Sequence, residues 1–216
     1  GRRGGALTVT LALVEHEAGS PADTSLQALT LARDVADAED EAVTAVVVGD
    51  EGAGVADAVG EYGADAVCHV THDDLDAYAP GAWAASLGQV ADERDPAAVV
   101  APGTDRGQEI LAHVAARRDL PLAANCTAVE VDDAYEVTRE RWGGSLIEHA
   151  RLSGDPKLLP SAPHSVAADP AAEATAPAVE PFEPTLDETD LRVRLVDREE
   201  ADVEGIPLGQ ARVVVG

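Results

Sequence analysis

The chain has 216 residues, of which 45% are hydrophobic and 26% are charged. That length and composition are typical of one folded domain with a buried core, and they exclude a chain that is disordered throughout. No apolar run reaches the roughly 18 residues needed to cross a bilayer, so direct insertion into a membrane is not expected. The first residues lack the pattern of a signal peptide. Because the sequence contains no methionine at all, we expect a fragment or a processed product.

The charge is strongly unbalanced, with 41 acidic residues against 15 basic ones and a formal net charge of -26. Such a field repels polyphosphates, which excludes nucleic acid as a partner. The acids are spread along the chain and do not form one acidic tail. We therefore expect a cytoplasmic protein of a halophilic organism, in which molar salt shortens the Debye length to about 3 Å and screens the self-repulsion.

This interpretation makes a prediction about stability. The domain should be less stable in dilute buffer than in molar KCl, because unscreened repulsion between carboxylates disfavours the compact state. Thermal melting followed by circular dichroism at the two salt concentrations measures the difference, which we expect to be several degrees. A melting temperature that does not change would contradict the prediction.

Strands and helices alternate over the first two-thirds of the chain. Buried strands are expected at 8–14, 43–48, 66–70 and 97–101, and helices at 23–38, 53–62, 81–93 and 105–117. Continuous apolar strands separated by helices are typical of a parallel sheet covered on both faces. The predicted fold class is α/β: a three-layer α/β/α sandwich with a mostly parallel, Rossmann-like sheet of the adenine-nucleotide α-hydrolase-like type.

The pattern changes after Pro121. Three strand-like segments, 125–131, 135–142 and 145–152, follow one another closely and predict a small antiparallel addition. Residues 167–188 are rich in Ala, Pro and Glu and are interpreted as an extended surface connection, and 191–196 as an edge strand. A last strand at 211–215 suggests that 1–210 form one domain and that 211–216 begin a second, truncated one.

Two motifs have a chemical and a simpler interpretation. Residues 46–54 join strand to helix with the glycine pattern G-x-x-G-x-G, which could hold a phosphate or form an ordinary tight turn; Asp50 and Glu51 favour the turn. Cys68, His69 and His72 could be metal ligands, but neighbouring strand residues point to opposite faces. A buried Cys68 beside solvated histidines is favoured. Cys68 and Cys126 fall in separate strands, so no disulfide framework is implied.

Two further segments are candidates for partner contact. Residues 101–109 leave a strand at the carboxyl edge of the sheet, with Thr104 or Asp105 as the N-cap of the next helix. Thr104 and Arg106 could contact a ligand or partner, or the loop could merely start the helix. Arg141, Trp142, Gly143 and Gly144 lie at a predicted hairpin turn and could form a partner interface or pack locally.

The chain carries no recognisable catalytic arrangement. Neither a Ser/His/Asp set nor a P-loop lysine is present, and acids are too abundant for any pair of carboxylates to be informative. Lys157, the only lysine, follows Gly-Asp-Pro and is expected in a solvated turn. Catalytic activity of the chain itself is therefore not expected.

Several of these segments, in this order, resemble the amino-terminal domain of electron-transfer flavoprotein α subunits. The resemblance covers roughly residues 6 to 216, and the order and spacing of its pieces carry it. One departure is the segment 157–166, which lacks that family's usual T-V-R-x-x-x-F run. The similar segments are 13–16 (LVEH), 101–117 (starting APGT), 125–130 (NCTAVE), 141–147 (RWGGSLI) and 211–215 (ARVVV).

The resemblance implies that the intact protein pairs with a β subunit, holds FAD, and carries electrons from dehydrogenases, such as acyl-CoA dehydrogenases, to a membrane quinone reductase. It also implies that the flavin is bound mainly by a carboxyl-terminal domain, and AMP by the β subunit. This fragment would then be a scaffold with no cofactor of its own.

Two alternatives stay open at this point. One is a stand-alone AMP- or ATP-binding module of the universal-stress-protein type, which shares the layered fold. The other is a small hydrolase, for which no nucleophile and base can be named. Fold resemblance alone does not decide between them.

Overall fold

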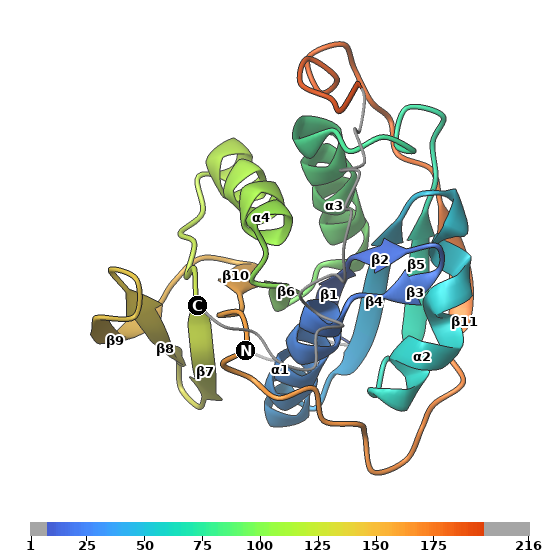
Figure 1. Ribbon diagram of the computed structural model, residues 1–216. Helices are drawn as coiled ribbons and strands as arrows, with labels where there is room; N and C mark the ends of the chain where they lie inside the picture. The colour runs from blue at the N-terminus through green and yellow to red at the C-terminus, as the bar shows by residue number, and fades with distance from the viewer. Residues whose placement is uncertain (1–7, 197–216) are drawn as a thin grey trace, which may run out of the picture.

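A six-stranded parallel sheet forms the centre of the structure (Figure 1). The computed structural model describes residues 8–196. The strands lie in the order β10-β6-β1-β4-β5-β11, and every neighbouring pair is parallel. Their bounds are β1 Val9–Val14, β4 Ala42–Val48, β5 Ala66–Val70, β6 Ala98–Ala101, β10 Lys157–Pro160 and β11 Ala178–Phe182.

Helices cover both faces of this sheet, which confirms the predicted three-layer sandwich. Figure 1 shows α3 and α4 above the sheet and α1 and α2 below it. A small antiparallel pair, β2 (His16–Glu17) and β3 (Ser20–Pro21), joins β1 to α1. The helices are α1 (Asp23–Glu39), α2 (Ala56–Glu61), α3 (Pro80–Arg94) and α4 (Asp105–Arg118), and a 3₁₀ helix (Asp50–Val55) precedes α2.

The central strand β1 contributes to two hydrophobic cores, one on each face of the sheet. Ala12 and Val14 pack in the cluster that contains the buried face of α1, whereas Leu11 and Leu13 pack in the cluster formed with α3 and α4. Burying a leucine side chain fully stabilises the fold by about 1.5–3 kcal/mol. Because both faces of β1 are covered, its sequence is a continuous apolar run instead of an alternating one.

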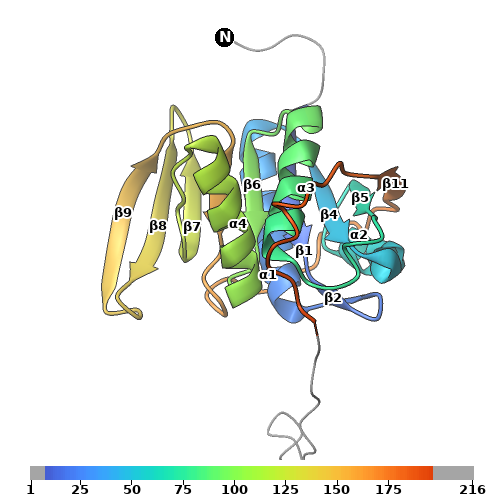
Figure 2. The same cartoon turned by 90° about the horizontal axis from the view of Figure 1, so that it is seen from above.

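The predicted antiparallel addition is confirmed. It consists of β7 (Cys126–Val131), β8 (Tyr135–Arg141) and β9 (Leu146–Leu152), with β8 in the middle. Tyr135, Val137 and Leu152 are buried in the same cluster as α1. Figure 2 shows this small sheet at one end of the central sheet, so it extends the same folded body.

Strand β10 corrects the prediction for Lys157. That residue was expected in a solvated turn, but it begins β10, and its side chain is only 13% exposed. The Lys157 Nζ lies 2.8 Å from Asp155 Oδ1 and 4.9 Å from the centre of the Tyr135 ring. The strand was missed because it is four residues long and ends in Pro160, too short for a clear periodic signal.

Two predictions for the later part of the chain are wrong. Residues 167–188 are not only a surface connection, because they contain β11, which pairs with β5 and completes the sheet. Glu180 and Pro181 disguise this strand, and both residue types are typical of sheet edges. Residues 191–196, expected as an edge strand, form a turn and irregular backbone instead. The strand predicted at 211–215 lies outside the described residues.

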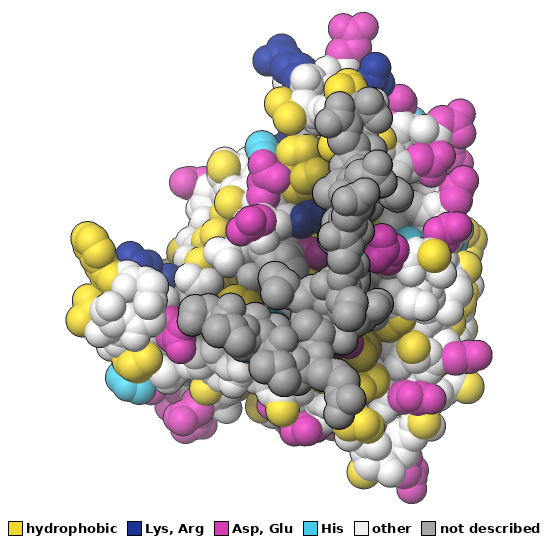
Figure 3. Space-filling view, in the orientation of Figure 1, with side chains coloured by type: hydrophobic (Ala, Val, Ile, Leu, Met, Phe, Trp, Pro, Cys, Tyr) yellow, Lys and Arg dark blue, Asp and Glu magenta, His cyan; other side chains and the backbone are white. Residues whose placement is uncertain are grey.

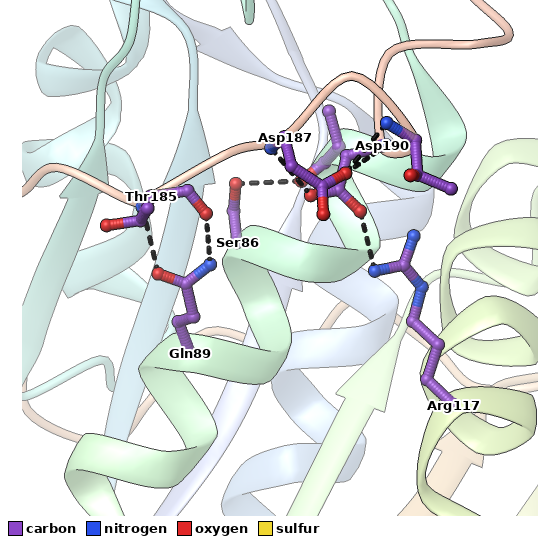
Figure 4. Close-up of polar contacts among 8 residues, drawn as sticks. Ser86, Gln89, Arg117, Thr185, Asp187 and Asp190 are labelled. Atoms are coloured by element: carbon purple, nitrogen blue, oxygen red, sulfur yellow. Dashed lines mark hydrogen bonds and ion pairs between the residues drawn. The ribbon is translucent and has the colours of Figure 1, made fainter.

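Polar contacts hold the segment after β11 across α3 and α4 (Figure 4). Gln89 Nε2 donates to the Thr185 carbonyl oxygen at 2.8 Å, and the Thr185 amide donates back to Gln89 Oε1 at 2.9 Å. Arg117 Nη1 lies 2.7 Å from Asp190 Oδ1. The Asp187 carboxylate accepts the amide of Asp190 at 3.1 Å, and backbone amides of this kind hold the pKa of Asp187 below its usual value.

Both cysteines are free and buried, as expected for Cys68. Burial raises the pKa of Cys68 to about 11 and that of Cys126 to about 12. We therefore expect no reaction with Ellman's reagent at pH 8 in the native protein, and reaction of both thiols in guanidinium chloride. A thiol that reacted in the native protein would contradict this.

The same shifts predict a fall in stability at alkaline pH. An unfolded thiol has a pKa of about 8.5, below both folded values, so the unfolded state loses thiol protons first. The thiol contribution to the free energy of unfolding is therefore fully present below about pH 8.5 and is lost as the pH rises toward 11. Denaturant titrations between pH 8 and 11 measure it, and the Cys68→Ala variant should show a weaker pH dependence.

Candidate protein interface

The carboxyl ends of β1 and β6 meet at the point of the sheet edge where α/β folds bind ligands. The chain adds β4 and β5 on one side of β1, and β6 and β10 on the other. Thr104 follows β6, and its Oγ1 donates a hydrogen bond to Oε1 of Glu15, which follows β1. The chain's own side chains therefore bridge the two strand ends.

Two further contacts fix this bridge in place. Ser25 Oγ accepts the amide of Glu15 at 2.8 Å and donates to the Glu15 carbonyl at 3.2 Å. Thr104 Oγ1 accepts the amide of Gly107 at 2.9 Å, which confirms Thr104 as the N-cap of α4. Thr104 thus has a structural role at this edge, and the Glu15 carboxylate lies where a bound phosphate would meet the strand ends.

Arg106, in the first turn of α4, lies against two aromatic rings. Its guanidinium carbon is 4.6 Å from the centre of the Tyr78 ring and 5.6 Å from that of Trp83. The two rings meet edge to face at 5.4 Å, and Tyr78 Oη donates to Glu109 Oε2 at 2.7 Å. Burial, followed by this hydrogen bond, raises the pKa of Tyr78 well above its usual value. Arg106 is therefore a half-buried cation held on an aromatic surface.

Sequence reasoning identified Arg106 but missed its aromatic partners. Trp83 falls within the helix predicted at 81–93, and Tyr78 precedes the observed helix α3 by two residues. The sequence did contain one indication of an aromatic cluster. The chain has only six aromatic residues, three Tyr, two Trp and one Phe, and Tyr78 and Trp83 are five positions apart.

The predicted hairpin turn projects from the antiparallel sheet and exposes apolar side chains. Trp142 is 81% exposed, Leu146 55% and Ile147 57%. Figure 3 shows hydrophobic and basic side chains gathered at this end of the molecule. Gly143 and Gly144 have φ of +60° and +79°, and Trp142 itself has φ of +55°. A bulky residue in the left-handed region is strained, so the backbone holds this indole outward at an energetic cost.

Arg141 lies beside this exposed tryptophan, and its counterion in the described part of the chain is Glu148, which Arg139 shares. Glu148 receives two hydrogen bonds from Arg139, at 3.1 and 3.2 Å, and lies 3.6 Å from Arg141 Nε. These guanidinium groups hold the pKa of the Glu148 carboxyl below its usual value, Arg139 contributing most. Glu148 therefore serves both Arg139 and Arg141.

Leu146 and Ile147 were not singled out from the sequence. Successive residues of a strand point to opposite faces of the sheet. Where only one face of a sheet is covered, two large apolar residues in succession therefore indicate that at least one of them is exposed. We name Trp142, Leu146 and Ile147 the hairpin tip.

The structure does not bring all the predicted site residues together. Thr104 and Arg106 lie at the start of α4, with Arg106 facing α3, whereas 141–144 lie beyond α4 on the antiparallel sheet (Figures 1 and 2). Figure 2 shows the β8–β9 turn and the first turn of α4 on the same side of the molecule, below in that view. They are two separate regions of one side.

The other two motifs have structural roles. The glycine turn after β4 is a 3₁₀ helix in which a Cβ on Gly52 would lie 2.7 Å from the Val47 side chain, and His69 Nε2 lies 2.8 Å from the Gly49 carbonyl oxygen. Cys68 is buried. Between residues 8 and 196, no group of three or more His, Cys, Asp or Glu side chains is placed to hold a metal ion. Within the same range, no helix is long and apolar enough to span a membrane.

Comparisons with known proteins agree on one family. The model of the electron transfer flavoprotein domain matches residues 10–187. Protein FixB of Clostridium saccharobutylicum is 26% identical over 204 residues, which cover 93% of this chain and 61% of that protein. Electron transfer flavoprotein subunit alpha of Syntrophomonas wolfei subsp. wolfei is 33% identical over 118 residues, covering 54% of this chain and 37% of that protein.

A further relative is acryloyl-CoA reductase electron transfer subunit beta of Anaerotignum propionicum, 29% identical over 118 residues, which cover 55% of this chain and 32% of that protein. The matches span from about a third to about three-fifths of the length of these relatives. The family match covers most of the central sheet, its helices and the antiparallel addition. The chain belongs to the electron transfer flavoprotein domain family.

Proposed function

We propose that the chain is the amino-terminal domain of an electron-transfer flavoprotein α subunit, spanning 1–210 with 211–216 opening a second domain, and that it docks a β subunit. The observation that supports this most directly is the exposed hairpin tip. A solvated domain gains nothing from a strained, outward-pointing tryptophan beside two exposed aliphatic side chains, whereas a protein interface buries such residues. Family membership supports the assignment of the partner.

The proposed wider role is electron transfer by the intact protein. It would hold FAD and pass electrons from dehydrogenases, such as those that oxidise acyl-CoA, to a membrane quinone reductase, in the cytoplasm of a salt-adapted cell. The residues at the carboxyl edge described above do not fit a flavin or a nucleotide, because the Glu15 carboxylate and its bridge to Thr104 occupy that edge. We therefore place the flavin outside this domain, and give this domain no catalytic step.

A stand-alone nucleotide-binding module remains the rival function. It would need free amide groups and a neutral or basic lining at the switch point between β1 and β6. Two features argue against it. The hydrogen bond between Thr104 and Glu15 closes the switch point, and the turn after β4 carries the acids Asp50 and Glu51. For a hydrolase, no nucleophile and base can be named among the described residues.

Isothermal titration calorimetry tests the proposal directly. The chain would be titrated in molar KCl with AMP, with FAD, and with the β subunit encoded in the same genome. We expect binding of the β subunit and none of either nucleotide. Tight AMP binding without binding of the β subunit would overturn the proposal and favour the rival.

A further inference from the structure

Within residues 8–196, Arg106 differs from most other cations in having no carboxylate partner. The chain has 41 acidic residues for 15 basic ones, and six described cations have a carboxylate oxygen within 3.1 Å. Arg106 makes no hydrogen bond or ion pair with any residue between 8 and 196, and its contacts there are the two aromatic rings. The paired cations are Arg94, Arg117, Arg118, Arg139, Arg151 and Lys157.

The aromatic rings hold this unpaired group in a defined position. Trp83 is 7% exposed, so its ring is fixed by the core around α3. The hydrogen bond from Tyr78 to Glu109 fixes the second ring. Stacking on both rings limits the rotamers of Arg106 before any partner arrives, which lowers the entropy lost on binding. The rings cover a face of the guanidinium, and its edge N–H donors have no acceptor among residues 8–196.

The surrounding charge limits what can occupy this position. Glu109 uses its carboxylate for Tyr78, and Glu15 uses its own for Thr104. Both acids nevertheless repel anions, and the repulsion grows with the charge of the anion. A doubly charged phosphate is therefore disfavoured relative to a singly charged carboxylate. The planar two-oxygen carboxylate also matches the paired N–H donors of a guanidinium edge.

We infer that Arg106, held on Tyr78 and Trp83, binds a carboxylate side chain on the surface of the partner protein. The aromatic pair forms the floor of this contact. It is separate from the hairpin tip, so the partner would touch the same side of the domain at two places. The identity of the partner as the β subunit rests on the proposed function.

Affinity measurements on matched variants test the inference. The dissociation constant of the complex with the β subunit would be measured for wild type, Arg106→Gln, Arg106→Lys and the control Arg151→Gln. We expect Arg106→Gln to weaken binding on the order of tenfold to a hundredfold. Arg106→Lys should weaken it less, because it keeps the charge but loses the two-pronged geometry.

The control removes one positive charge at a different place. Arg151 is 71% exposed and paired with Glu136 near the end of β9 remote from the turn, so Arg151→Gln should stay within about twofold of wild type. A charge-reversal scan of the partner's acids should identify one Asp→Lys or Glu→Lys variant that restores binding to Arg106→Glu.

The possible outcomes separate the inference from the proposed function. If the wild-type chain and Arg106→Gln bind the β subunit equally, the inference is overturned and the proposed function stands. If the wild-type chain does not bind, both are overturned. A separate experiment titrates phosphate into the Trp142→Phe variant, in which the fluorescence of Trp83 reports binding. Submillimolar phosphate binding that depends on Arg106 would also overturn the inference. If Arg106→Gln does not fold, the affinity of Arg106→Lys relative to wild type tests the inference, and equal affinities would overturn it.

Discussion

Replacing Gly103 with alanine should destabilise the domain by ~3 kcal/mol. Gly103 lies in the turn from β6 to α4, where an added Cβ would meet the Ser161 carbonyl oxygen at 2.2 Å and the Pro163 ring at 2.7 Å. Neither a backbone carbonyl nor a proline ring can rotate away, so the turn itself must shift. Because Thr104 follows directly, the shift should also disturb its bridge to Glu15.

Thermal and denaturant unfolding measure this effect, and we expect the melting temperature to fall by about 6–12 °C for a domain of this size. The matched control is Gly88→Ala in α3, where the three atoms nearest to the new Cβ all belong to the guanidinium of Arg118, the closest at 3.1 Å. That side chain can move, and alanine favours the helix by up to ~1 kcal/mol, so the control should lie within ~1 kcal/mol of wild type. Equal losses in the two variants would contradict the argument.

Replacing Trp142 should have the largest effect on partner binding. Tryptophan at the centre of an interface contributes about 2–4 kcal/mol when it is truncated, so Trp142→Ala should weaken binding of the β subunit by about 30-fold to 1,000-fold. The stability of the isolated domain should hardly change, because the side chain is 81% exposed. Trp142→Phe should keep an intermediate affinity.

The strained backbone gives this prediction a sharper form. Trp142 has φ of +55°, a region that glycine occupies freely. Trp142→Gly should therefore leave the melting temperature unchanged or raise it, while it weakens binding as much as the alanine variant does. The control is Val193→Ala, another exposed apolar side chain (65%) away from the hairpin tip. Binding that survives Trp142→Gly would show that the partner docks elsewhere.

The layered core could be predicted from the sequence because its signals are strong and local. The run Val9–Val14 and the helical spacing of α1, α3 and α4 depend on residues close in the chain, and the expected bounds agree with the structure to within one or two residues. The edge strand β11 could not be found in this way, because its pairing with β5 joins residues more than a hundred positions apart. Conversely, 191–196 alternate like a strand but pair with no neighbouring strand in the described structure.

The candidate interface was predictable only in part, for the same reason. The capping role of Thr104 is local, whereas its bond to Glu15 spans 89 positions. The exposure of Trp142 follows from glycines in a tight turn, which the sequence displays. The position of Arg106 depends on Tyr78 and Trp83, which only the packing of α3 against α4 brings near it.

The late strand β11 has a practical consequence for anyone who expresses shorter versions of this chain. A fragment that stopped near residue 166 would contain every strand–helix repeat and would look complete by sequence. It would nevertheless leave the backbone amides and carbonyls of β5 open along one side, since residues 178–182 cover them. An unpaired strand edge pairs with strands of other molecules and promotes aggregation, so such a fragment should precipitate. Any shortened version should therefore retain residue 182.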